Sequence, residues 1–228
     1  MHAVAAPRAP LGFYLREAGA DPAATFHAIA AKGFREVELA GFRDRRPSET
    51  RKLLDAAGLS CKTVCWSMWL NDGDSQETID AAVELGALYL VTPDPSRMGK
   101  EWFEPAVPER MTLNDWRWNA DWFNHVGGLA QKNDIQFAYR NQSFDFARLG
   151  NSTGFDELYR RTEPTRVKFE LDCAAATAGG CPPQEFLKRY ADRTHLLHIS
   201  DPADGTDGPE IRYRYLAAKG SEPVSGGQ

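Results

Sequence analysis

The sequence predicts an α/β fold, a parallel (β/α)8-type TIM barrel that is incomplete, with seven clear strands. Strand-like apolar runs alternate with helical patterns along most of the chain, which is the pattern of repeated βαβ units. Right-handed crossovers place each helix outside a parallel sheet, so successive units favour a barrel. No GxGxxG follows the first strand and no P-loop is present, which disfavours the nucleotide-binding doubly wound folds.

The first unit shows the pattern most clearly. The apolar run Leu11–Leu15 predicts a strand, and Asp21-Pro22 predicts a helix start because Asp is a preferred N-cap and Pro suits the first helical position. Gly33 stands where a left-handed residue closes a helix, and the run 35–40 predicts the second strand.

The unit then repeats along the chain. Further helices are expected at 47–57, 75–85, 113–132, 155–161 and from Pro183 onward, and further strands at 62–67, 88–92, 135–139, 167–171 and 196–199. The tail holds one more expected strand, Ile211 to Leu216, but not another complete helix–strand unit. We therefore expect an open barrel whose first and seventh strands expose their edges, which favours a homo-oligomer or a partner chain.

The length of 228 residues indicates a single domain, 1–228, slightly short of the about 250 residues of a typical eight-unit barrel. Residues 1–10 and 217–228 are expected to be flexible. Hydrophobic residues make up 42% and charged residues 26%, so a sizeable core can form.

Charge and cysteine usage narrow the class of protein. The formal net charge is −5 and no basic block is present, which argues against a nucleic-acid partner. No stretch is apolar enough for a membrane span or a signal peptide. The four cysteines match no zinc or redox spacing, so free thiols and a cytoplasmic location are expected.

Polar residues follow the expected strands where catalysis takes place in parallel barrels, at their carboxyl ends. In chain order these are Glu38, Cys65, Arg140, Asn141, Gln142, Glu170, Asp172, His198 and Asp201. Alternation puts Glu170 and Asp172 on one face of their strand. Asp172 and His198, on neighbouring strands, could both reach one divalent ion at about 2.0–2.2 Å, but two ligands are too few.

Simpler interpretations stand beside these. Asp172 could cap a helix or pair with an arginine, and His198 could be a core histidine. Glu38 and Glu170 could form ordinary ion pairs. The tryptophans, Trp66 among them, favour packing over a sugar-stacking platform.

Several segments together resemble one known family. They are DPAATFHAIAAKGFREVELAG at 21–41, LLDAAGL at 53–59, TLNDW at 112–116, VKFELD at 167–172 and LLHISD at 196–201. In this order they resemble the sugar phosphate isomerase/epimerase family with the xylose-isomerase-like TIM barrel, of which the chain looks like a divergent, C-terminally shortened member.

The resemblance implies a cofactor and a role for each site residue. Family members hold one Mn²⁺ or Mg²⁺ ion through carboxylates and histidines, and carboxylates move a proton through an enediol-type intermediate. By this resemblance Asp172 and His198 stand at metal-ligand positions, an incomplete set, and Glu38 and Asp172 are the catalytic candidates. The substrate-binding candidates are Trp66, Arg140, Gln142 and Glu170. The expected partner is a small sugar or polyol, which places the chain in carbohydrate metabolism.

The chain also departs from the family pattern. Where relatives read YHNH, this chain reads Tyr139-Arg140-Asn141-Gln142, and Cys65 stands at a family histidine. Ser200 replaces the lysine of HVKD, and the final-strand glutamate has no counterpart before Gln228. A guanidinium offers no lone pair and stays protonated in a protein, so Arg140 is no metal ligand and the usual metal site is incomplete.

Three hypotheses stay open, and whether the chain is an active enzyme stays open with them. In the first, the metal site is eroded, Arg140 replaces the ion and pairs with Asp172 and Glu170, and the barrel binds carbohydrate or serves a partner subunit. In the second, an active isomerase or epimerase uses Glu38, Asp172 and His198, while Arg140 grips a phosphate or carboxylate. The third is a lyase or nuclease variant, whose nuclease form the negative charge disfavours.

Overall fold

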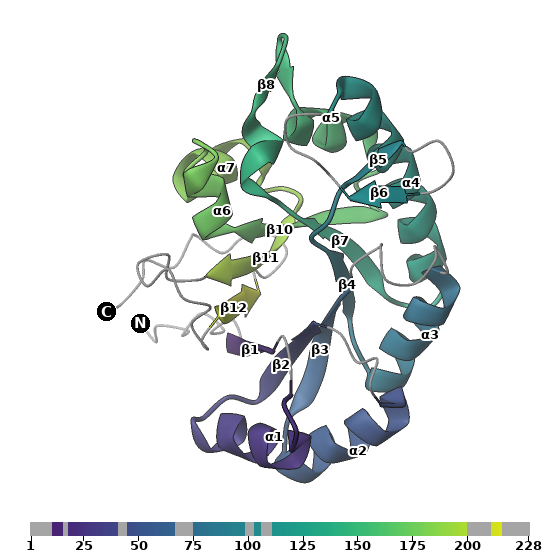
Figure 1. Ribbon diagram of the computed structural model, residues 1–228, viewed down its shortest axis with the longest axis vertical. Coiled ribbons are helices and arrows are strands. Elements are labelled where there is room, and N and C mark those ends of the chain that lie inside the picture. Colours follow the sequence, from purple (N-terminus) through teal and green to yellow (C-terminus); the bar gives the residue numbers. More distant parts are fainter. Residues whose placement is uncertain are drawn as a thin grey trace, which may run out of the picture.

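The structure is a computed structural model that describes residues 11–15, 18–40, 45–66, 75–98, 103–105, 111–199 and 211–215 (Figure 1). For Leu11, Met98, 103–105 and 211–215 it describes the backbone alone. The termini expected to be flexible, 1–10 and 217–228, lie outside this part of the chain, as do Ser200 and Asp201.

The seven predicted parallel strands are confirmed. They are β1 (Leu11–Leu15), β2 (Glu36–Ala40), β3 (Ser60–Cys65), β4 (Tyr89–Thr92), β7 (Gln136–Arg140), β10 (Val167–Asp172) and β11 (Thr194–Ile199). Each pairs in parallel with the next strand in this series. Helices lie between successive strands, so this part of the fold is a (β/α) barrel in the predicted order.

The expected open edges are wrong, because β12 (Ile211–Tyr215) closes the ring. This strand pairs antiparallel with both β1 and β11, and the strand order around the barrel is β1-β12-β11-β10-β7-β4-β3-β2. An antiparallel neighbour needs no crossover helix, so a short segment can fill the gap. The argument for a partner chain from exposed strand edges no longer holds.

The helices lie outside the ring of strands, as Figure 1 shows. They are α1 (Pro22–Ala31), α2 (Pro47–Ala57), α3 (Ser75–Leu85), α4 (Leu113–Gln131), α5 (Gly154–Arg161), α6 (Cys173–Ala178) and α7 (Pro183–Tyr190). The predicted helix ends are confirmed: Asp21 Oδ1 accepts from Ala24 N at 3.0 Å, and Gly33 has a left-handed φ of 96°. Only α6, six residues directly after β10, was not predicted.

Small elements fill two of the loops. The insert after β4 forms a two-stranded antiparallel sheet of β5 (Ser96–Met98) and β6 (Phe103–Pro105). The loop after β7 holds a 3-10 helix, η3 (Ser143–Phe146), and a hairpin of β8 (Arg148–Leu149) and β9 (Ser152–Thr153). No helix in the described part of the chain is long and apolar enough to cross a membrane.

The main core lies between the outer face of the strands and the helices. Phe123 of α4 stacks on Tyr139 of β7 with ring centroids 5.1 Å apart, and Phe155 of α5 packs on Phe169 of β10 at 4.8 Å. Because side chains alternate along a strand, these outward rings turn the neighbouring Arg140 and Glu170 towards the barrel interior.

Candidate functional site

Four polar side chains from separate strands are buried inside the barrel. Glu38 of β2, Arg140 of β7, Glu170 of β10 and His198 of β11 are 1%, 8%, 0% and 3% exposed. Burying ionisable groups costs free energy unless they are paired or neutralised, so such a concentration favours a functional over a packing role.

The Arg140 guanidinium reaches across the barrel from β7. Its Nη1 lies 2.9 Å from His198 Nδ1 and 3.6 Å from Glu38 Oε1, and Nη2 donates to Cys65 Sγ at 3.5 Å. Its Cζ lies 5.3 Å from the centre of the Tyr14 ring, a cation–π distance. Tyr14 belongs to β1, which stands opposite β7 in the strand order, so the guanidinium lies near the barrel axis.

The contact with Arg140 fixes the tautomer of His198. All guanidinium nitrogens are donors, so His198 Nδ1 must accept, and the proton of the neutral ring lies on Nε2. Burial, with the adjacent Arg140 charge, lowers the pKa of His198 to about 2. His198 is therefore a neutral ring with its Nδ1 lone pair already used.

Asp172 lies beside this pair, at the carboxyl end of β10. Its Oδ1 accepts from Ala175 N at 2.9 Å and caps α6, and its Oδ2 lies 4.0 Å from His198 Nε2. Burial raises the pKa of Asp172, although the hydrogen bond from Ala175 opposes this shift. Asn141 holds the Asp172 backbone on both sides, accepting from its N at 2.8 Å and donating to its O at 3.2 Å.

The expected ion pair between Arg140 and Asp172 is not observed among the described residues. Within the same part of the chain, the carboxylate that forms an ion pair with the guanidinium is Glu38, at 3.6 Å. The reason is the direction of the Arg140 side chain, which points across the barrel towards β2, whereas Asp172 turns one oxygen to the first turn of α6.

Neither carboxyl oxygen of Glu170 has a hydrogen-bond partner within the described residues. No ion pair between Glu170 and Arg140 is observed in this part of the chain, although the Arg140 charge acts to lower the pKa of Glu170. Burial, together with nearby Glu38, raises the pKa of Glu170 well above its ordinary value, which favours the neutral form of this side chain. Leaving a buried carboxyl group without hydrogen-bond partners costs free energy, and a ligand that bonds to it would recover this cost.

The other two substrate-binding candidates border the same end of the barrel. Gln142 donates from Nε2 to Pro93 O at 2.6 Å, which ties the end of β7 to the loop after β4. Trp66 directly follows β3 and packs in the main core, and its indole nitrogen has no hydrogen-bond partner among the residues described.

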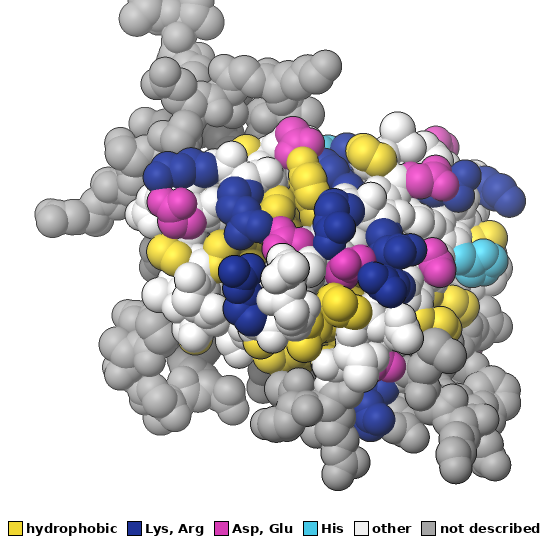
Figure 2. Space-filling model, turned by 90° about the horizontal axis from the view of Figure 1, so that it is seen from above, with side chains coloured by type: hydrophobic (Ala, Val, Ile, Leu, Met, Phe, Trp, Pro, Cys, Tyr) yellow, Lys and Arg dark blue, Asp and Glu magenta, His cyan; other side chains and the backbone are white. Residues whose placement is uncertain are grey.

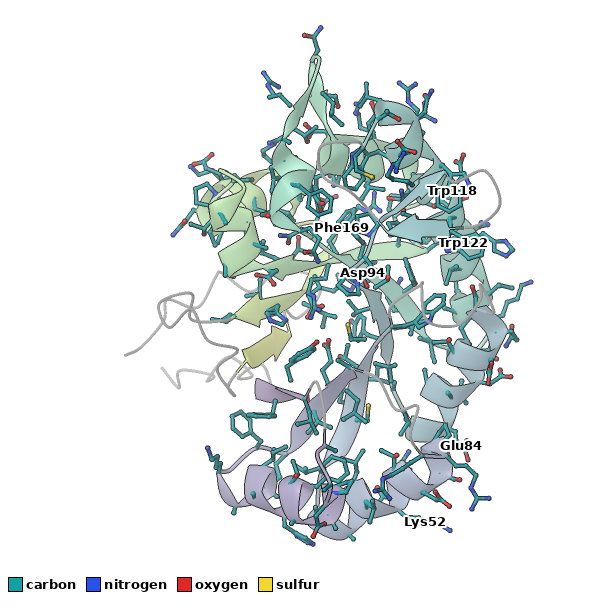
Figure 3. The ribbon with its side chains drawn as sticks, viewed as in Figure 1. Lys52, Glu84, Asp94, Trp118, Trp122 and Phe169 are labelled. Carbon is teal, nitrogen blue, oxygen red and sulfur yellow. The ribbon has the colours of Figure 1, made fainter. Side chains whose placement is uncertain are left out.

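Three residues near the site were not singled out from the sequence. Tyr14 lies edge-on to His198 with ring centroids 5.3 Å apart. Asp94, in the loop after β4, lies near the middle of the ring of strands in Figure 3. Burial is the main cause that raises the pKa of the Cys65 thiol, and the charge of Asp94 adds to this rise. Asp145 accepts from Tyr139 Oη at 2.8 Å and from Gln142 N at 2.9 Å. The Pro-Asp-Pro sequence after a strand was the available signal for Asp94.

The implied divalent metal does not fit the described residues. No group of three or more His, Cys, Asp or Glu side chains there could hold a metal ion. The His198 nitrogens support this, because one accepts from Arg140 and the other carries the proton.

No protein-family model matches the chain. Among curated proteins it is 22% identical over 183 residues to an inosose dehydratase from Bacillus anthracis, covering 76% of this chain and 61% of the relative. An inosose dehydratase from Geobacillus kaustophilus is 27% identical over 136 residues, which cover 60% of this chain and 41% of that protein. The chain thus spans less than two thirds of the length of these relatives.

The likeness to solved structures covers a larger share of the chain. A sugar phosphate isomerase/epimerase from Parabacteroides distasonis has a TM-score of 0.71 at 22% identity, covering 90% of this chain and 82% of that one. The 3-keto-D-glucoside 4-epimerase from E. coli has a TM-score of 0.63 at 15% identity, with 86% and 82% covered. A xylose isomerase-like barrel from Mycobacterium smegmatis, in complex with magnesium, has a TM-score of 0.58 at 17% identity, with 85% and 71% covered. These likenesses confirm the predicted resemblance, and the chain has the fold of the sugar phosphate isomerase/epimerase group of xylose-isomerase-like TIM barrels.

Proposed function

We propose that this barrel binds a small sugar-derived compound at the carboxyl ends of its strands and acts on it by proton transfer. The similar proteins are named for inosose and for a 3-keto-D-glucoside, which are hydroxyl-rich ketones. Ligands of parallel barrels bind at this end of the strands, which is also where Glu38, Arg140, Glu170 and His198 meet.

The single observation that carries the proposal is the buried Glu170 carboxyl without hydrogen-bond partners among the described residues. A neutral carboxyl can donate one hydrogen bond to a carbonyl oxygen and accept another from a hydroxyl. Hydroxyl-rich ketones offer both groups. Glu170 is therefore the proposed contact for the ligand oxygens, next to the donors of Arg140.

The proposed chemistry follows from the charges around these oxygens. Negative charge that develops on a ligand carbonyl oxygen would be stabilised by the Arg140 guanidinium and by a hydrogen bond from Glu170. Glu38 and Asp172 are the proposed groups that remove and return the proton on carbon. Gln142 and Trp66 are proposed to border the bound ligand.

The test is solvent deuterium exchange into a panel of inososes, ketohexoses and 3-keto-glucosides, read by proton NMR with EDTA present. We expect exchange at carbon next to the carbonyl of at least one compound. Glu38→Gln should reduce its rate by about a hundredfold, within the range for loss of a general acid or base. Glu84→Gln, an exposed change on α3, is the matched control and should retain the wild-type rate.

A non-catalytic carbohydrate-binding barrel is the second candidate, favoured by the neutral, fixed state of His198. Calorimetric titration of the same panel separates the two. Binding without exchange supports the second candidate, and neither binding nor exchange with folded protein rejects a sugar-type ligand altogether.

A further inference from the structure

The Arg140 guanidinium connects strands that are not neighbours. β7 pairs with β4 and β10, yet the guanidinium contacts Glu38 of β2, Cys65 of β3 and His198 of β11. One positive group near the axis thus joins polar side chains from three other strands. That is the arrangement expected of a central cation held by converging ligands.

The same contacts exclude a divalent ion from that position. An ion bound to His198 Nδ1 would lie about 2.1 Å along its lone pair, where Arg140 Nη1 already stands at 2.9 Å. The ion would lie within about 1 Å of Nη1, which sterics and like charge both forbid. His198 Nε2 carries the proton and has no lone pair to offer.

Two further candidate metal ligands already have partners. Asp172 Oδ1 caps α6 through Ala175 N, and Glu38 lies 3.6 Å from the guanidinium as its ion-pair partner. Mn²⁺ and Mg²⁺ require several oxygen or nitrogen ligands around one point. The described residues provide them only if Arg140 leaves.

We propose that Arg140 is a built-in cation that takes the place of a divalent metal ion, so that the wild-type site works without metal and excludes it. The positive charge presented to the ligand is then +1 and covalently fixed, instead of +2 and exchangeable. Removing the guanidinium releases His198 Nδ1 and Glu38, and a weak metal site with Asp172 appears.

The experiment is calorimetric titration of metal-free protein with MnCl2, supported by EPR of free Mn²⁺. Four proteins are compared: wild type, Arg140→Met, Arg140→His and Arg117→Ala, the last being a control at a partly exposed arginine of α4. We expect no stoichiometric Mn²⁺ in wild type or in the control. Arg140→His should bind Mn²⁺ at least about tenfold more tightly than wild type, a difference of about 1.4 kcal/mol.

Adding His198→Ala to Arg140→His should remove the gained affinity. Stoichiometric Mn²⁺ in wild type that His198→Ala abolishes overturns the proposal, as does equal Mn²⁺ affinity in wild type and both folded Arg140 variants. Circular dichroism checks folding, and if neither Arg140 variant folds, wild type decides alone: stoichiometric Mn²⁺ overturns the proposal and its absence supports it. Because the titration uses metal alone, its result is independent of whether the proposed sugar ligand is found.

Discussion

Two buried arginines stand at opposite ends of the barrel and have different kinds of partners. Arg193 lies just before β11, 3% exposed, and Nη1 donates to Tyr159 O at 2.7 Å and Thr162 O at 3.1 Å. Its Nη2 donates to Thr162 Oγ1 at 2.6 Å and Val167 O at 2.8 Å. Arg140, at the carboxyl end of β7, instead contacts side chains that ionise or bind ligands.

The difference separates a structural arginine from one of the site. Arg193 donates to backbone oxygens of three residues, and its guanidinium carbon lies 4.7 Å from the centre of the Phe169 ring. Arg140 has longer contacts, 3.5 Å to Cys65 and 3.6 Å to Glu38, with partners that can rearrange. Burial alone therefore does not identify a functional arginine, whereas the chemistry of its partners does.

The largest effect is expected at Arg193. Arg193→Ala removes the buried hydrogen bonds to the carbonyl oxygens of Tyr159, Thr162 and Val167, and the free energy of unfolding should fall by about 4 kcal/mol. Urea denaturation followed by circular dichroism measures it. A loss of unfolding free energy below about 1 kcal/mol would contradict the structural role of Arg193 and its contrast with Arg140.

The next effect concerns Asp145, which lies behind Arg140 and accepts from Tyr139 and Gln142. Burial raises the pKa of Asp145 from 3.8 to about 8. The folded protein then holds a proton that the unfolded chain releases near pH 4, so stability falls as pH rises through this range and levels off above pH 8.

Asp145→Asn removes this titration and keeps an oxygen acceptor for both donors. Relative to the variant, wild type should lose roughly 1 kcal/mol per pH unit between about pH 5 and pH 8. Denaturant midpoints across pH give the difference. Parallel pH profiles for the two proteins would mean that Asp145 is ionised in the fold.

A smaller effect on stability is expected in the site itself. The double variant Arg140→Met with Glu38→Gln replaces a buried ion pair by neutral groups of similar size, and unfolding free energy should change by less than about 1 kcal/mol. The same denaturation assay measures it. A loss as large as that of Arg193→Ala would assign Arg140 to the framework and not to the site.

The smallest effect is expected at the surface. Figure 2 shows basic and acidic side chains interspersed on the face seen from above, where α5 lies. Here Arg160 lies 2.8 Å from Glu157, which also has Arg161 at 3.1 Å and Arg117 at 3.6 Å. In Arg160→Ala, Glu157 keeps Arg161 and Arg117 as ion-pair partners, so the free energy of unfolding should fall by about 0.5 kcal/mol or less. A loss above about 2 kcal/mol would show that exposed arginines also hold the fold.

Periodicity and caps were sufficient to predict the parallel strands and most helices. Asp21 and Gly33 act on their own helix ends, so their effect can be predicted from the local sequence. The closing strand β12 was foreseen as a strand, but its antiparallel pairing depends on the gap between β1 and β11, which no local pattern reports. Helix α6 is too short to show a helical period.

Sequence reasoning singled out the polar residues that the structure buries inside the barrel, but not the contacts between them. Glu170 and Asp172 were expected on one face of their strand, because alternation within one strand is local. The partner of Arg140 was wrong because it depends on distances across the barrel. A register shift between Val37 and Glu38, and another between Phe169 and Glu170, also change which side chains meet.

The most direct test of the central claim is a crystal structure of the wild-type protein grown with excess MnCl2, measured at the manganese absorption edge. The guanidinium of Arg140 should lie within hydrogen-bond distance of His198 Nδ1, with no anomalous peak between Glu38, Asp172 and His198. An anomalous peak coordinated by these three side chains, with Arg140 turned away from the barrel axis, would contradict the replacement of a metal ion by arginine.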